Sequence, residues 1–291
     1  LGEHVDEMAV IRSLWTDIPD HGIASRFLHT GATQQPKPSL GSWVLYGLGN
    51  ANQNMPGFIS LGGSPEWRQA SFLPGVFQGT PFTADKPIPN LTRPPGVSDR
   101  ADADTREFLK LLNAEHAKAR PGDAQLSARI ASYELAAKMQ LSIPAVRDLS
   151  TESATSLAMY GADDAQNSLK AAYAKNCILA RRLLEKGVRF VQLFNGAYQT
   201  GGEGVSNWDG HKVIEKQYSV HGPVFDQPTA ALLKDLKQRG LLEDTLVVWG
   251  GEFGRTSYCQ GKISKDFGRD HHPRCFTAWF AGGGIKAGSV Y

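Results

Sequence analysis

The second half of the chain alternates between helical and strand-like segments, and this alternation limits the folds open to it. Residues 167–186 carry apolar side chains at helical spacing, and the apolar run 188–193 that follows Gly187 is typical of a buried strand. The same order returns in residues 224–239 and 245–249. Strands joined by helices through short turns are typical of βαβ units. The pattern predicts an α/β fold, a three-layer sandwich with a mostly parallel central sheet flanked by helices.

The first half of the chain is less regular. It predicts strands and helices over residues 8–15, 22–29, 39–48 and 58–61. Residues 64–98 are rich in proline and glycine and predict a long irregular excursion, a type of loop that is usually functional or flexible. Residues 102–140 predict two helices, separated at Pro121, that form an insertion outside the sheet. Since no internal repeat divides the chain, we expect a single domain over residues 1–291.

The composition limits the partners that the chain can have. Charged residues make up 21% of the sequence and the net charge is +2, without blocks of lysine or arginine, which predicts no nucleic-acid partner. No apolar run approaches the roughly 18–20 residues needed to cross a bilayer, which predicts no membrane span. The three cysteines are an odd number at irregular spacing and fit neither a disulfide framework nor a zinc pattern.

Polar side chains collect in four loops next to the predicted strands, close to glycines. These loops contain, in chain order, Thr16 and His21; Asp209 and His211; Glu252; and Asp270 and His271. In open α/β sheets, ligands bind beyond the carboxyl ends of the strands. Carboxylate and imidazole groups suit zinc and related divalent ions, and glycine lets the backbone approach a small site closely. We therefore expect one or two divalent metal ions, with Asp209, His211, Glu252, Asp270 and His271 as ligands.

Two arginines, Arg255 and Arg269, lie in the same loops. The planar guanidinium group matches the oxygens of phosphate and sulfate, so both arginines indicate an anionic substrate. The candidate metal ligands also have simpler interpretations. Asp209 and His211 could form a hydrogen-bonded pair in a loop, and Glu252 could pair with Arg255. The shared position of the four loops beside one predicted sheet favours the metal site.

Three runs of residues resemble a known family. They are residues 245–256 (Thr-Leu-Val-Val-Trp-Gly-Gly-Glu-Phe-Gly-Arg-Thr), 268–273 (Gly-Arg-Asp-His-His-Pro) and 281–286 (Ala-Gly-Gly-Gly-Ile-Lys). Together they resemble an uncharacterised sulfatase-like branch of the alkaline phosphatase superfamily, whose members are typically exported bacterial proteins. The resemblance implies an alkaline-phosphatase-like fold and a periplasmic or secreted location. Compared with that fold, the chain looks truncated at both ends.

The resemblance also implies roles for individual residues around two metal ions. It places Asp209, His211 and His271 on one metal, and Glu252 where the second metal takes an Asp-His pair. Phe253 stands where the histidine of that pair is expected.

We expect Thr16, His21 and Arg255 to be the catalytic residues, and the resemblance places Thr16 near the position of the nucleophile. A helix N-terminus beside Thr16 would favour a phosphorylated or sulfated oxygen. The sequence has no Cys-x-Pro-x-Arg motif, which argues against the common formylglycine mechanism of sulfatases.

These observations predict a metal-dependent hydrolase of sulfate or phosphate esters. Its substrate would be a small anionic ester, such as a sulfated or phosphorylated glycan, and its cofactor a divalent ion: zinc, calcium, magnesium or manganese. Two alternatives stay open. One is a single-metal hydrolase, in which Asp209, His211 and His271 hold the ion and an activated water attacks. The other is a non-catalytic exported binding protein that retains the fold.

Overall fold

The strands of the computed structural model, which describes residues 1–34, 36–52, 54–84, 95–196 and 207–291, form three sheets. The four-stranded sheet has the order β5-β8-β1-β9, over Leu246–Trp249, Phe276–Gly282, Met8–Leu14 and Ser289–Val290. The three-stranded sheet has the order β3-β2-β4, over Thr80–Phe82, Phe58–Leu61 and Phe190–Leu193. The third sheet is a hairpin of β6, Gly254–Cys259, and β7, Arg269–His272.

The direction of the strands differs between the two larger sheets. In the three-stranded sheet β2 pairs in parallel with both β3 and β4, which agrees with the predicted parallel sheet. β3 itself was not predicted, because it lies within residues 64–98, which were expected to be irregular. In the four-stranded sheet both β1 and β5 run antiparallel to β8. The prediction of one mostly parallel sheet is therefore wrong for this part of the fold. Its physical reason is the connection between β5 and β8: the β6–β7 hairpin stands where a parallel pair needs a crossover helix.

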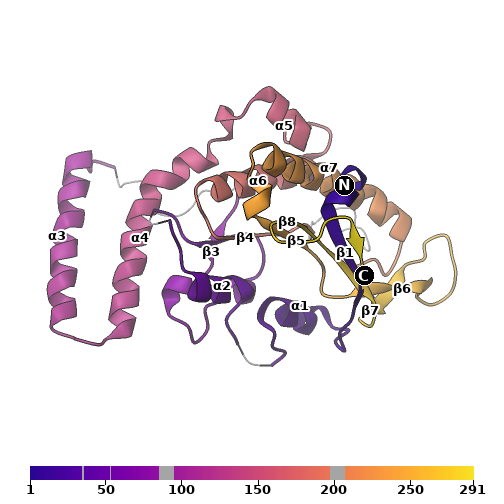
Figure 1. Ribbon diagram of the computed structural model, residues 1–291, viewed down its shortest axis with the longest axis horizontal. Helices are drawn as coiled ribbons and strands as arrows, with labels where there is room; N and C mark the ends of the chain where they lie inside the picture. The colour runs from indigo at the N-terminus through magenta and orange to yellow at the C-terminus, as the bar shows by residue number, and fades with distance from the viewer. Residues whose placement is uncertain (35, 53, 85–94, 197–206) are drawn as a thin grey trace.

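Helices lie on both sides of the strands (Figure 1). α1, His21–Thr30, and α2, Leu40–Leu48, lie on one side; α5, Ala154–Tyr160, α6, Ser168–Glu185, and α7, Ile214–Gln238, lie on the other. The main core forms where α6 and α7 meet and includes the buried side chains of Cys177, Ile178, Leu233 and Leu236. The sequence predicted α7 only from residue 224, but the helix begins at Ile214 and contains Pro223.

Two helices form an arm that extends from the body of the molecule (Figure 1). They are α3, Asp99–Lys118, and α4, Ala124–Arg147. They correspond to the predicted helical insertion over residues 102–140 and extend beyond it at both ends. Each begins at a side-chain cap: Ser98 accepts from the Ala101 N–H at 3.2 Å, and Asp123 accepts from the Leu126 N–H at 2.9 Å. Of the predicted excursion 64–98, residues 85–94 lie outside the described residues.

Five short 3₁₀ helices complete the described fold: η1 Gly2–Glu7, η2 Pro65–Arg68, η3 Gly75–Phe77, η4 Leu149–Thr151 and η5 Leu242–Asp244. Among the described residues, no helix combines the length and the apolar character that crossing a membrane requires.

A buried network of ion pairs joins α6 to α7 and to the segment before α5. The guanidinium group of Arg181 contacts Glu152 at 2.8 Å, Asp235 at 3.0 Å and Glu185 at 3.0 Å. Arg182 contacts the other oxygen of Glu152 at 2.5 Å. The side chains of Arg181 and Glu152 are only 3% and 6% exposed. Burial raises the pKa of Glu152, but the hydrogen bonds from the two arginines outweigh it and leave the pKa below its ordinary value.

Candidate metal centre

Four separate segments bring their side chains to one place beside the β6–β7 hairpin. His21 is the first residue of α1, whose N-cap Asp20 accepts from the Ile23 N–H at 3.0 Å. Asp209 lies in the turn before α7, Glu252 lies between β5 and β6, and His271 lies in β7. The site therefore depends on how the hairpin docks against α1 and the Asp209 turn.

Backbone contacts hold the hairpin against the Asp209 turn. The N–H of Arg269 donates to the carbonyl of Gly210 at 2.8 Å, and Lys212 forms an isolated bridge with Phe267. At Gly268 a Cβ atom would lie 2.0 Å from the carbonyl carbon of His211. Only glycine fits this close approach, so the sequence of the hairpin sets the position of β7 relative to Asp209.

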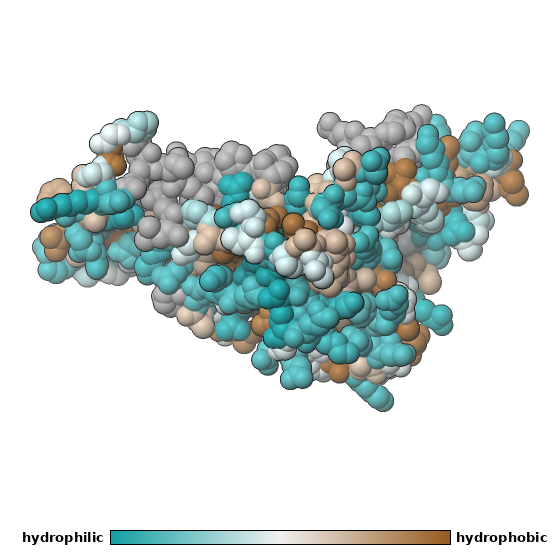
Figure 2. Space-filling model, turned by 90° about the horizontal axis from the view of Figure 1, so that it is seen from above, coloured by the Kyte–Doolittle hydropathy of each residue, from teal (hydrophilic) through white to brown (hydrophobic). Residues whose placement is uncertain are grey.

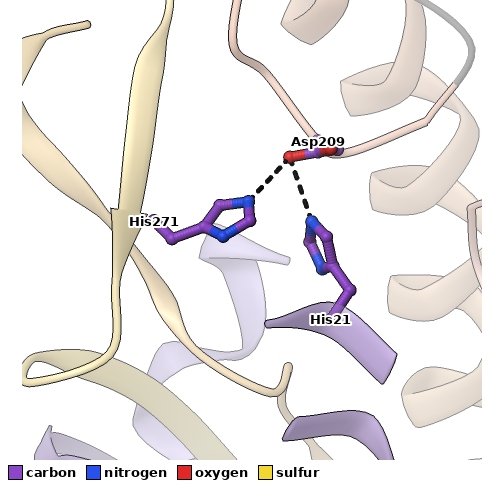
Figure 3. A group of neighbouring side chains, drawn as sticks. All are labelled: His21, Asp209 and His271. Carbon is purple, nitrogen blue, oxygen red and sulfur yellow. Dashed lines mark hydrogen bonds and ion pairs between the residues drawn. The ribbon is translucent and has the colours of Figure 1, made fainter. Parts of the chain in front are cut away.

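Three imidazole rings surround one oxygen of Asp209. The distances to Asp209 Oδ1 are 3.1 Å from His21 Nε2, 2.9 Å from His211 Nε2 and 3.2 Å from His271 Nε2. Figure 3 shows His21 and His271 pointing at Asp209 from two different elements. Arg255 donates to the same oxygen. Two overlapping groups could hold a metal ion: His21, Asp209 and His271, and His211, Asp270 and His271.

The opposite nitrogen of each ring has an oxygen partner. His21 Nδ1 contacts Glu252 Oε1 at 2.6 Å, His211 Nδ1 contacts Gln260 Oε1 at 2.6 Å, and His271 Nδ1 contacts the carbonyl of Pro19. A backbone carbonyl only accepts, so His271 Nδ1 carries a proton, and the same holds for His21 opposite an ionised Glu252. Metal-binding histidines characteristically donate their second nitrogen to a carboxylate or a carbonyl in this way.

These hydrogen bonds leave the Nε2 atoms to face one another. His211 Nε2 and His271 Nε2 are 3.0 Å apart, and the buried Nε2 of His21 has no hydrogen-bond partner among the described residues, although it lies within ion-pair distance of Asp209. With Nδ1 protonated, each neutral ring presents a lone pair here. Either the rings carry a second proton, or a cation lies among the lone pairs. The donor set therefore fits a bound cation.

Electrostatics keep the two carboxylates of the site ionised. Burial raises the pKa of Asp209, but the hydrogen bond from Arg255 and the nearby rings of His21 and His271 outweigh this effect and hold the pKa far below its usual range. Burial likewise raises the pKa of Glu252, and the hydrogen bond from His21 brings it below the ordinary value. The hydrogen bond to Glu252 in turn raises the pKa of His21.

The structure brings most of the predicted site residues together, in roles that partly differ. Glu252, predicted as a ligand, lies behind His21 and fixes its orientation. His21, predicted as catalytic, is placed as a candidate ligand. Asp270 is half exposed and lies 3.9 Å from His211 Nδ1. The remaining predicted residue, Thr16, is buried, and its N–H donates to the carbonyl of Pro273 at 2.8 Å, with no described contact from its hydroxyl to the cluster.

Sequence reasoning missed the residues that support the rings. Pro19 and Gln260 act through a carbonyl and an amide, groups that occur throughout any sequence, so no signal marked them. Phe253 packs against both His21 and His271, with ring centroids 4.9 and 4.5 Å apart. It was singled out only as the residue that stands where a histidine is expected, and its packing against the rings was not predicted.

Fold and cluster together define a mixed α/β protein with two overlapping groups of side chains that could hold a metal ion. The family described as "Protein of unknown function (DUF1501)" matches residues 1–291, and the chain belongs to that family. No curated protein and no solved structure matches the chain.

This membership corrects the resemblance drawn from residues 245–256, 268–273 and 281–286. The family that covers the whole chain has no known function, and nothing in the comparisons connects the chain with alkaline phosphatases or sulfatases. The assignment to a sulfatase-like branch is therefore wrong. The alkaline-phosphatase-like fold, the second metal and the periplasmic or secreted location lose the support that they took from it.

Proposed function

We propose that His21, Asp209 and His271 hold one divalent metal ion and that the chain is a hydrolase of anionic esters, of phosphate or of sulfate. The observation that carries the proposal is the convergence of His21 Nε2, His271 Nε2 and Asp209 Oδ1. The two nitrogens lie 3.1 and 3.2 Å from the oxygen. Ligands about 2.0–2.2 Å from a tetrahedral ion are separated by about 3.3 Å, so small shifts would fit zinc.

The chemistry of the donors favours zinc over the other ions. Two imidazoles and one carboxylate suit zinc and its transition-metal neighbours, whereas calcium and magnesium prefer sites made of oxygens. Three protein ligands with a fourth position open to water or substrate are typical of catalytic zinc. An ion there would supply Lewis acidity, which polarises the ester and lowers the pKa of an attacking water. A single-metal hydrolase, with His21 rather than the predicted His211 as the third ligand, therefore agrees better with the geometry than Thr16 as nucleophile.

Arg255 is the residue that favours an anionic substrate. Its guanidinium group is anchored by the carbonyl of Arg269 at 3.3 Å and by Asp209, so it lies at the edge of the proposed ligand set. A planar guanidinium group in this position matches two oxygens of a phosphate or sulfate group. The Nε2 of His211 lies 2.9 Å from the same oxygen of Asp209, where an imidazole could exchange a proton with a bound ester.

Metal removal is the direct test of this function. The purified chain, loaded with zinc and dialysed, is assayed for metal content and for hydrolysis of nitrophenyl phosphate and nitrophenyl sulfate. We expect about one ion per chain and hydrolysis of at least one ester, lost after chelation and restored by added zinc. Manganese, calcium and magnesium serve as comparison ions. Tight zinc binding without turnover of either ester would reject the hydrolase and leave a metal-dependent binding protein. A chain that binds none of the four ions would reject the whole proposal.

Glu252 provides a second test, which asks whether its hydrogen bond positions His21 as a ligand. Replacing Glu252 with alanine removes the carboxylate that orients His21, and we expect zinc affinity to fall by about 10- to 100-fold in titration calorimetry. Glu243→Ala, at an exposed glutamate in η5, is the matched control and should leave the affinity unchanged. Equal affinities for both variants would show that Glu252 does not position a ligand.

A further inference from the structure

The outer helix of the arm carries its apolar side chains on the side that faces solvent. Phe108, Leu111 and Leu112 of α3 are 60%, 66% and 49% exposed. No residue of α3 is buried. Figure 2 shows hydrophobic residues at the surface of the end of the molecule that the arm forms. An amphipathic helix in a folded protein normally turns its apolar stripe toward a packing partner.

The side of α3 that faces α4 is mostly polar instead. Its less exposed positions are Asp102, Arg106, Asn113 and Ala117, spaced four, seven and four residues apart and so aligned in one stripe. At about 100° per residue, Phe108, Leu111 and Leu112 lie on the opposite side of the helix. Among the described residues, packing within the arm therefore does not account for the apolar stripe, which suits a partner from another molecule.

The charges along α3 indicate what that partner is. The half of the helix before the apolar stripe is acidic, with Asp99, Asp102, Asp104 and Glu107 against two arginines, and the half from residue 109 onward has Lys110 and Lys118 against one glutamate. A second α3 laid antiparallel over the stripe would place the acidic half of each copy opposite the basic half of the other. Antiparallel packing also opposes the two helix dipoles favourably.

We propose that α3 is the interface of a homodimer, in which two copies of the chain pack their α3 helices antiparallel about a twofold axis near Leu111. Such an interface uses the same surface on both copies, as a twofold axis requires. Counting outward from Leu111, position 104 of one copy lies opposite position 118 of the other. Asp104 of each copy therefore pairs with Lys118 of the second copy, and Phe108, Leu111 and Leu112 fill the centre. This proposal is independent of the proposed function.

The test is the oligomeric state in sedimentation equilibrium, over concentrations from about 1 µM to about 1 mM. We expect a concentration-dependent dimer, and Leu111→Glu should weaken its association by about 100-fold or more, because two apolar contacts are replaced by charges. Leu48→Glu is the matched control, since Leu48 in α2 is 68% exposed and lies outside the arm. Circular dichroism verifies that each variant keeps its helix content.

Charge reversal tests the antiparallel register. Asp104→Lys alone and Lys118→Asp alone should each weaken the dimer by about fivefold, and the double variant should restore it, because the pairs are exposed and individually weak. A chain that stays monomeric throughout would overturn the proposal and leave the stripe to a different partner. A dimer that survives Leu111→Glu, or one that Leu48→Glu disrupts equally, would also overturn it. A double variant weaker than both single ones would reject the antiparallel arrangement.

Discussion

Replacing His271 with alanine is expected to reduce the bound zinc from about one ion per chain to a trace. If three protein ligands share a binding free energy of about 10–16 kcal/mol, the loss of one lowers the affinity by on the order of 10³-fold or more. His271 is the strongest choice because it belongs to both groups of candidate ligands. Elemental mass spectrometry after dialysis measures the effect, and calorimetry gives the affinity.

His272 offers the matched control for this prediction. It is the next residue of β7, and because side chains alternate along a strand, it points to the other face. His272→Ala should keep its zinc. Equal loss in both variants would mean that the hairpin had lost its fold, whereas equal retention would remove His271 from the ligand set.

Replacing Glu152 with glutamine is expected to lower the free energy of unfolding by about 3–5 kcal/mol. The change leaves the guanidinium group of Arg182 without the carboxylate that it contacts at 2.5 Å, and an uncompensated buried charge is costly. Arg181 loses its contact with Glu152 at 2.8 Å but keeps Asp235 and Glu185. Urea denaturation measures the difference. Asp17→Asn, in an exposed pair with Arg274, is the matched control and should cost less than about 1 kcal/mol. A similar effect in both variants would show that the buried network does not stabilise the fold.

The same network predicts how stability depends on pH. The pKa of Glu152 in the folded chain lies below its ordinary value of 4.5, so its contribution is fully present above that value. It is lost as the pH falls through the lower pKa of the folded state. We therefore expect the stability gap between the wild type and Glu152→Gln to be constant near neutral pH and to narrow in acid. A gap that widens below pH 4.5 would contradict this assignment.

Much of the fold could be predicted from local patterns, because each pattern depends on neighbours in sequence. The strand at Phe58–Leu61 and the helix Ser168–Glu185 follow from short apolar runs and helical spacing, and the structure has them within a residue or two of the expected bounds. Strand direction could not be predicted in the same way. Residues 254–259, Gly-Arg-Thr-Ser-Tyr-Cys, contain no apolar run and were not predicted as a strand. The hairpin that they form with β7 is what reverses β8.

The sequence predicted which residues belong to the candidate site better than it predicted the role of each residue. Asp209, His211 and His271 stood out because acids and histidines next to glycine-rich strand ends are uncommon, and the structure brings all three within hydrogen-bonding distance. The separate roles of His21 and Glu252 depend on which ring nitrogen faces which oxygen. The docking of α1 against the loop after β5 decides which nitrogen faces which oxygen. Because these two segments are far apart in the sequence, no local pattern encodes their contact.

Gly268 has no side chain, yet it controls the distance between the side chains of Asp209 and His271. Any larger residue would meet the backbone of His211 and push β7 away from the Asp209 turn. His271 lies three residues further along the same strand segment, so the displacement would reach its ring directly. Selection for a metal site in this chain would therefore act on residue 268 as strongly as on the ligands. A search for metal-binding side chains alone would miss this position, because glycine has no side chain.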